Sequence, residues 1–98
     1  MEGLSSYYAK KFFGRKTANG EIFDMYKLTA AHRFLPFGTI LEVTNLSNHR
    51  SVRVRVNDRG PFAGNRILDL SYGAARKIDM ISSGVSKVKI RIIQLGTK

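Results

Sequence analysis

The sequence contains no cysteine, which excludes both a disulfide framework and a thiolate metal site. Two histidines without cysteine also make a poor zinc site, so we expect no metal and no cofactor. No run of apolar residues approaches the roughly 20 needed to cross a bilayer, and we expect no membrane insertion by this domain. The first residues lack the basic and apolar segments of a signal peptide. The chain is therefore expected to be either cytosolic or a trimmed domain of an exported protein.

Several enzyme classes leave no trace in the sequence. It has no phosphate-binding loop, dinucleotide fingerprint, H-E-x-x-H zinc motif or G-x-S-x-G nucleophile elbow. Acidic residues are scarce, because 7 Asp and Glu stand against 17 Lys and Arg, for a formal net charge of +10. Such a charge favours an anionic partner, which can be nucleic acid, an anionic membrane surface or an acidic polysaccharide. Charge alone does not choose among the three.

Length and alternation predict one small all-β domain over residues 1–98. Apolar and basic residues alternate over 51–58 and again over 87–92, which is typical of half-buried strands. We expect further strands at 4–9, 28–33, 39–46 and 66–70, with a turn at 47–50. Ser71 is a good N-cap for a helix over 72–78. Six short strands and one short helix indicate a small closed barrel, although the pattern does not predict the strand order.

Asp58 is the first candidate for chemistry. It continues the parity of Val52, Val54 and Val56, so it is expected on the core-facing side where the strand ends. A carboxyl group there loses solvation, which raises its pKa and lets it hold a proton near neutral pH and donate it to a leaving group. The alternative is that Asp58 only opens a turn, because residues 57–61 (NDRGP) are strong turn formers. The spacing leaves both interpretations open.

Three further polar residues have two interpretations each. His32 follows strand parity and is expected to face inward, either as a hydrogen-bonded core residue or as a group that moves protons or orients a carboxyl. Glu21 either tethers its turn-rich loop or forms, with Asp58, the carboxylate pair that a glycoside hydrolase needs. Asp69 is expected to fix loop backbone or to pair with an arginine.

Loop aromatics can line a sugar groove, stack on bases or plug the barrel, and we expect core packing for Phe23, Phe34 and Phe37.

Four segments follow one another along the chain: residues 14–24 (GRKTANGEIFD), 28–39 (LTAAHRFLPFGT), 54–62 (VRVNDRGPF) and 64–71 (GNRILDLS). Together they resemble the motifs of the rare lipoprotein A (RlpA) family. Four long motifs in one order make a specific match, and the resemblance extends over most of the chain. It departs at His49 and Asp79, which stand where glycine is common; a His at positive φ is unusual.

The resemblance implies a six-stranded double-psi β-barrel with one or two short helices, related in fold to barwin and expansins. It implies an endolytic lytic transglycosylase, which cuts between N-acetylmuramic acid and N-acetylglucosamine in peptide-stripped peptidoglycan strands and leaves 1,6-anhydro ends. By resemblance, Asp58 is the catalytic acid, and Glu21 and His32 are its supporting catalytic residues. Six residues in or near the motifs are expected to bind substrate: Tyr8, Arg15, Asn57, Arg59, Phe62 and Arg66. No cofactor is implied.

The resemblance also bears on partners and location. We expect a monomer whose partner is the peptidoglycan glycan strand and not nucleic acid. We expect an exported protein of the cell envelope, in the periplasm or as an outer-membrane lipoprotein acting at the septum, with signal and anchor outside this chain. Two alternatives stay open. One is a non-catalytic polysaccharide-binding module of the expansin kind, and the other is a basic nucleic-acid-binding barrel, whose binding would fall steeply with salt.

Overall fold

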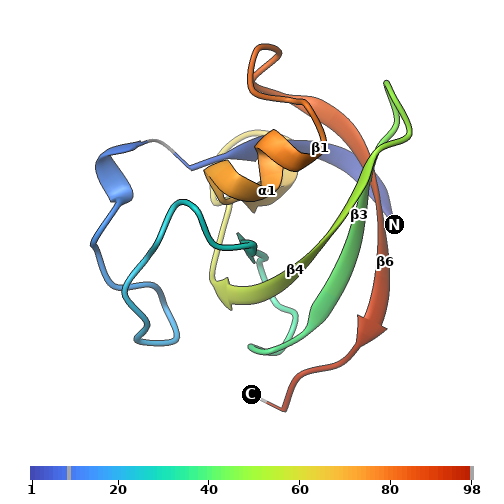
Figure 1. The fold of residues 1–98 in the computed structure, drawn as a ribbon. Coiled ribbons are helices and arrows are strands. Elements are labelled where there is room, and N and C mark those ends of the chain that lie inside the picture. Colours follow the sequence, from blue (N-terminus) through green and yellow to red (C-terminus); the bar gives the residue numbers. More distant parts are fainter. Residues whose placement is uncertain (9, 98) are drawn as a thin grey trace.

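The structure, a computed structural model, describes residues 1–8 and 10–97. It has six strands, a short helix and a 3-10 turn: β1 (Glu2–Tyr7), η1 (Lys10–Phe12), β2 (Thr29–Ala31), β3 (Ile40–Asn45), β4 (Ser51–Asp58), β5 (Arg66–Leu70), α1 (Tyr72–Lys77) and β6 (Ser86–Gln94). The strands close into a barrel in the order β1-β5-β2-β4-β3-β6 (Figure 1). The predicted all-β, six-stranded barrel with short helices is confirmed.

Two parallel pairs give the barrel its strand order. β1 pairs with β5 and β2 pairs with β4 in parallel, whereas the other four neighbouring pairs are antiparallel. Parallel strands need long crossover connections, so their partners lie far away in the chain and leave no hairpin signal. The β1–β5 pair, for example, places Leu4 beside Arg66.

Most strands lie where the sequence predicts them, although β6 extends one residue before and two residues beyond the predicted 87–92. β4 and β5 have the predicted bounds. β1 begins two residues before the predicted strand, whose last residue, Ala9, lies outside the described residues. β2 is only three residues long, shorter than the predicted 28–33. It ends because the chain turns at His32, whose Nδ1 accepts hydrogen bonds from the amides of Phe34 and Leu35.

Apolar residues that alternate along the strands fill the barrel interior, and Ala74 and Ala75 of α1 pack into the same core. Ser71 caps this helix as predicted, by accepting from the Ala74 amide. The core consists of Ala30, Leu35, Leu41, Val43, Val52, Val54, Val56, Leu68, Leu70, Ala74, Ala75, Ile78, Met80, Val88 and Ile90. Core packing is confirmed for Phe23, and Phe37 packs against the core while half-buried. It is wrong for Phe34, which is 70% exposed.

The regular alternation of β4 stops before its end. Opposite β2, the register moves from Ala30–Val56 to Ala31–Asp58, so Asn57 is an extra residue. Val56 and Asn57 are both buried, and Asp58 is half-buried. Such a bulge bends a strand and redirects the side chains that follow it. The parity that predicted Asp58 against the core therefore does not continue to this residue, and its carboxyl group reaches a surface cavity.

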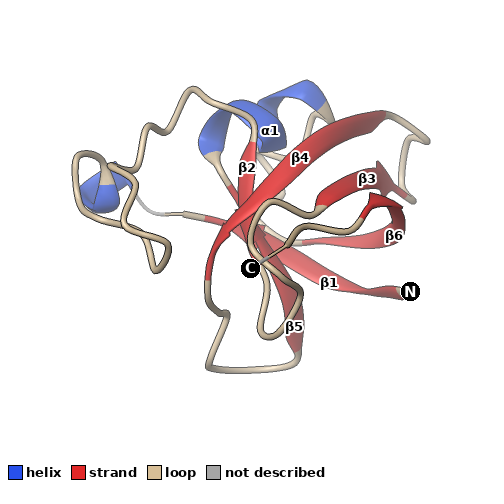
Figure 2. Ribbon diagram, turned by 90° about the horizontal axis from the view of Figure 1, so that it is seen from below, coloured by secondary structure: helices blue, strands red, loops and turns tan. Residues whose placement is uncertain are grey.

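The chain between β1 and β2 projects from one side of the barrel in both views (Figures 1 and 2). It includes η1 and a short bridge between Lys16 and Ile22. The Asn19 amide donates to the Asn57 carbonyl and so holds this segment against the end of β4. The projection brings loop residues to Asp58 that strand pairing alone would leave far from it.

Candidate active site

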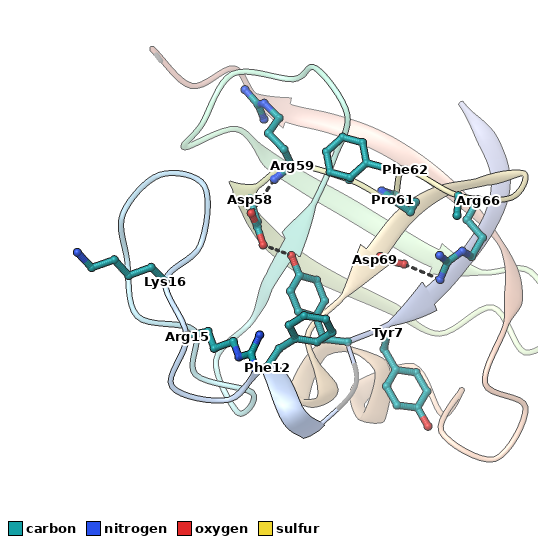
Figure 3. A pocket seen from close by; sticks show the side chains of 13 residues that line it. Tyr7, Phe12, Arg15, Lys16, Asp58, Arg59, Pro61, Phe62, Arg66 and Asp69 are labelled. Carbon is teal, nitrogen blue, oxygen red and sulfur yellow. Dashed lines mark hydrogen bonds and ion pairs between the residues drawn. The ribbon is translucent and has the colours of Figure 1, made fainter.

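An open cavity of about 720 Å³ lies where the ends of β1, β4 and β5 meet the projecting segment. Figure 3 shows Asp58 with Arg15 and Lys16 to one side and Arg66 and Asp69 to the other. The lining residues are Tyr7, Tyr8, Phe12, Arg15, Lys16, Asp58, Arg59, Gly60, Pro61, Phe62, Ala63, Arg66 and Asp69. Carboxyl, guanidinium and aromatic groups therefore converge on one open space.

Three hydrogen bonds hold the carboxyl group of Asp58. Its Oδ1 accepts from the backbone amides of Ala18 and Arg59, both at 2.8 Å. Its Oδ2 accepts from the hydroxyl of Tyr8 at 2.5 Å. The two amides can only donate, whereas a hydroxyl can donate or accept. Oδ2 is therefore the oxygen on which Asp58 can carry a proton and keep its partner.

Tyr8 is fixed by the rings around it. It stacks on the buried ring of Phe23, with 4.6 Å between centroids and 21° between planes, and meets Phe12 edge-on. Burial, together with the hydrogen bond to Asp58, raises the pKa of Tyr8 well above its usual value. Tyr8 therefore stays a neutral hydroxyl at any physiological pH.

The carboxylate group of Glu21 forms an ion pair with the guanidinium group of Arg55. Its two carboxylate oxygens accept from Arg55 at 2.5 and 2.8 Å, and amide groups of Asn19 and Asn57 donate to it as well. The hydrogen bonds from Arg55, foremost, lower the pKa of Glu21 to about 2. Glu21 is not among the residues that line the cavity. It ties the projecting segment, which carries Ala18, to β4.

His32 is buried, with 2% of its surface exposed, and does not line the cavity. Its Nδ1 accepts two backbone amides at 3.2 Å each, so the imidazole is neutral with its proton on Nε2. Burial lowers its pKa, and the charges of Arg59 and Arg33 lower it further. Its backbone amide donates to the Asp58 carbonyl at 3.2 Å. His32 is thus connected to Asp58 through the main chain.

Five of the six predicted substrate-binding residues line the cavity: Tyr8, Arg15, Arg59, Phe62 and Arg66. Phe62 is 82% exposed at its rim. Asn57 does not line it, because it is buried by the bulge and bonds to Glu21. Arg59 stacks over the Phe37 ring at 3.9 Å. Arg66 bonds to the Ser6 hydroxyl and pairs with Asp69 at 3.3 Å, the kind of arginine pair predicted for Asp69.

Sequence analysis did not single out Lys16, and it considered Arg33 only as an arginine near the motifs that could contact an acidic sugar. Lys16 lines the cavity beside Arg15, and its position within the first motif was the available signal. Arg33 donates to the carbonyls of Pro61 and Arg66, which fixes the loop that forms one wall. No sequence pattern predicts that arrangement, because the three residues come together only in the folded chain.

Two further observations concern the described part of the chain, residues 1–8 and 10–97. It holds no cluster of three or more His, Asp or Glu side chains able to bind a metal ion. None of its helices has the length and hydropathy to span a membrane.

The closed strand order defines a class of fold, the double-psi β-barrel domain. The Streptomyces papain inhibitor superposes with a TM-score of 0.71 at 25% identity, covering 92% of both chains. An expansin of Clavibacter michiganensis, solved as an aspartate-to-asparagine mutant in complex with cellohexaose, superposes with a TM-score of 0.72 at 19% identity. That match covers 100% of this chain and 53% of the expansin chain. The predicted double-psi barrel, related in fold to expansins, is confirmed.

Sequence comparison then shows the family. The model of the family described as lytic transglycolase matches residues 1–90. The endolytic peptidoglycan transglycosylase RlpA of Campylobacter jejuni is 56% identical over 96 residues, 98% of this chain and 35% of the relative. The probable RlpA of Synechocystis is 60% identical over 92 residues, 94% of this chain and 29% of the relative. The chain belongs to this lytic transglycolase (RlpA) family, and spans about a third of these relatives' length.

Proposed function

We propose that this domain is an endolytic lytic transglycosylase, which cleaves peptidoglycan between N-acetylmuramic acid and N-acetylglucosamine. The observation that carries the proposal is the carboxyl group of Asp58, held by three donors in an open cavity lined with cations. Family membership supports it, because both relatives compared above carry the name endolytic peptidoglycan transglycosylase.

One carboxyl group can perform both proton transfers. Protonated at Oδ2, Asp58 donates its proton to the glycosidic oxygen as the bond to C1 of the muramic acid breaks. The resulting carboxylate then takes the proton of the same sugar's 6-hydroxyl, whose oxygen bonds to C1 and closes a 1,6-anhydro ring. The reaction consumes no water and needs no cofactor, and Asp58 is protonated again at its end.

The arrangement of the other carboxylates favours this route over hydrolysis. A glycoside hydrolase uses a second carboxylate to activate water or to attack the sugar. Glu21 is held by Arg55 outside the cavity, and Asp69, which lines it, is paired with Arg66. An internal nucleophile removes the need for such a group. We therefore assign Glu21 and His32 to positioning Asp58, through the Ala18 loop and the 32–35 turn respectively.

The cavity also fits an acidic sugar strand. Once the stem peptide is removed, the lactyl group of muramic acid is a carboxylate, and Arg15, Lys16 and Arg66 can pair with it. Phe62, exposed at the rim, offers a ring face for a sugar to pack on. The substrate we propose is therefore the peptide-stripped glycan strand. We further propose that the protein is exported to the cell envelope and acts there as a monomer at the septum.

Mass spectrometry of the products from peptide-stripped strands tests the proposal. Anhydro ends from the wild-type domain, and none from Asp58→Asn, are expected. Reducing ends would show a hydrolase instead. A domain that binds strands but releases no product would favour the alternative, a non-catalytic binding module, which the fold shared with the cellohexaose-bound expansin makes the second candidate.

A further inference from the structure

A second cavity of about 510 Å³ lies between the 26–28 segment, the start of β4 and α1. It is lined by Tyr26, Leu28, Arg50, Tyr72, Gly73, Arg76 and Lys77. None of these seven residues lines the Asp58 cavity. Neither the proposed chemistry nor the family motifs assign it a role.

Positive charge gathers in this cavity from two separate parts of the chain. Arg76 and Lys77 occupy the last turn of α1, where cations favour the helix dipole. Arg50 comes from the turn before β4, and a helix dipole does not account for it. No acidic residue lines the cavity, and none of the three cations forms an ion pair with another described residue. An anion is the ligand that would relieve their mutual repulsion.

The cavity is preformed by contacts between the 25–28 segment and α1. The Gly73 amide donates to the Met25 carbonyl at 2.7 Å, and the Ser71 hydroxyl donates to the Lys27 carbonyl at 2.5 Å. A Cβ at Gly73 would lie 2.6 Å from the Tyr26 carbonyl oxygen, so this approach requires glycine. The segment that carries Tyr26 is therefore held against the helix without a ligand.

A series of rings connects the two cavities. Tyr26, 64% exposed, meets Tyr72 edge-on with 6.3 Å between centroids. Tyr72 in turn meets Tyr7 edge-on at 6.3 Å, and Tyr7 lines the Asp58 cavity. Aromatic faces with polar tips suit sugar rings, which also have apolar faces and hydroxyl edges. Three tyrosine rings in contact therefore connect two cavities that are both lined with cations.

We propose that the second cavity is a distal glycan-binding site, which holds an acidic sugar of the strand whose bond lies at Asp58. The sugar carboxylate pairs with Arg50, Arg76 and Lys77, and its ring packs on Tyr26. This inference rests on the proposed function and adds that tight binding requires a glycan strand long enough to reach both cavities. A strand that spans both cavities binds at two points and gains affinity from effective concentration, whereas a short fragment occupies one cavity only.

Binding measured by calorimetry on an Asp58→Asn background, which does not cleave, tests the site. The ligands are long peptide-stripped strands and a tetrasaccharide of the same repeat. Arg50→Gln/Arg76→Gln/Lys77→Gln is expected to weaken long-strand binding about tenfold or more and to leave tetrasaccharide binding unchanged. Tyr26→Ala is expected to act in the same direction.

The matched control is Arg53→Gln/Lys87→Gln/Lys89→Gln, which removes three exposed charges from β4 and β6 outside both cavities. It is expected to keep long-strand affinity within about twofold, since only the general field changes. Equal losses in both triple variants, or no loss in the cavity variant, would overturn the distal site. So would a loss confined to a single-stranded DNA oligonucleotide, which would assign the cavity to nucleic acid. Arg50→Gln alone repeats the test if the triple variant fails to fold.

The two proposals fail separately. Anhydro products from the wild type, with unchanged binding in the cavity variant, would leave the transglycosylase standing and remove the distal site. Absence of products, with long-strand binding lost in the cavity variant, would leave a two-site binding module and remove the enzyme.

Discussion

Tyr8, just beyond the end of β1, donates a 2.5 Å hydrogen bond to Oδ2 of Asp58 at the end of β4. Fifty residues separate them in sequence, and the parallel β1–β5 and β2–β4 pairs of the closed barrel bring them together. Because a hydroxyl can donate or accept, Oδ2 is the carboxylate oxygen that can carry a proton and keep its hydrogen-bond partner. In the mechanism proposed above, this contact would let the Tyr8 hydroxyl govern proton transfer by Asp58.

Tyr8→Phe removes that hydroxyl and keeps the ring that stacks on Phe23. We expect kcat on glycan strands to fall roughly 10- to 100-fold with little change in KM, because a hydrogen bond to a charged group is worth about 1.5–3 kcal/mol. The melting temperature is expected to stay close to wild type. Steady-state kinetics with a pH profile checks both, and a variant with wild-type kcat and an unchanged profile would remove Tyr8 from the mechanism.

Glu21→Gln is expected to lower stability in a pH-dependent way. The folded protein holds the pKa of Glu21 at about 2, whereas the unfolded chain has about 4.3. Between these values the unfolded state binds more protons, so the stabilisation is complete above about pH 4.3 and is lost as the pH falls toward 2. Because Glu21 is 39% exposed, we expect at most about 1 kcal/mol.

Urea unfolding of the wild type and Glu21→Gln at pH 7, 4 and 2 measures the difference. The wild type is expected to be the more stable at pH 7, and the two curves are expected to converge near pH 2. A difference that stays constant over this range would mean that the ionised Arg55–Glu21 pair does not stabilise the fold.

His32 is expected to stay neutral below the pH at which an exposed histidine protonates. Its pKa is lowered, so the stability that comes from the neutral ring is full above about pH 6.5 and decreases as the pH falls below it. Nitrogen NMR is expected to show the Nε2–H tautomer, since Nδ1 accepts two amides. His49→Gln leaves a single imidazole and so assigns the signal. A ring protonated at pH 6.5 would contradict the structural role.

Gly73→Ala is expected to destabilise the protein by about 1–3 kcal/mol, the usual cost of forcing atoms into a packed contact. The new Cβ would meet the Tyr26 carbonyl oxygen at 2.6 Å, which outweighs the gain in helix propensity of up to about 1 kcal/mol. Lys77→Ala, at an exposed position in the same helix, is expected to change stability by less than about 0.5 kcal/mol. Thermal unfolding of both variants measures the difference. Equal stabilities would mean that the 25–28 segment can move away from α1 without a cost in free energy.

Local patterns predicted most of the secondary structure. Alternation located β4 to the residue and β6 to within two residues, and the cap at Ser71 located the start of α1. His49 and Asp79, at positions where the family resemblance led us to expect glycine, both have positive φ, of 63° and 55°. The strand prediction was poorest at β2, because a strand of three residues is too short to show a pattern.

The candidate site was likewise predicted only in part from the sequence. Motifs singled out Asp58, Glu21 and His32, and Arg15, Arg59, Phe62 and Arg66 indeed line one cavity with Asp58. Sequence spacing could not show that Asn57 is an extra residue in β4, because a bulge exists only against a paired strand. Nor could it show that Arg55 holds Glu21 or that the Tyr8 hydroxyl meets Asp58.

What the sequence by itself determined is local: the strands, the helix cap, the turns, the basic charge and the family. These depend on backbone preferences and on residues a few positions apart. The tertiary structure alone decided which carboxylate is available for the proposed chemistry. Closing six strands into a barrel with two parallel pairs brings distant side chains within hydrogen-bonding distance, and those contacts determine which acids are neutralised by arginine and which faces an open cavity.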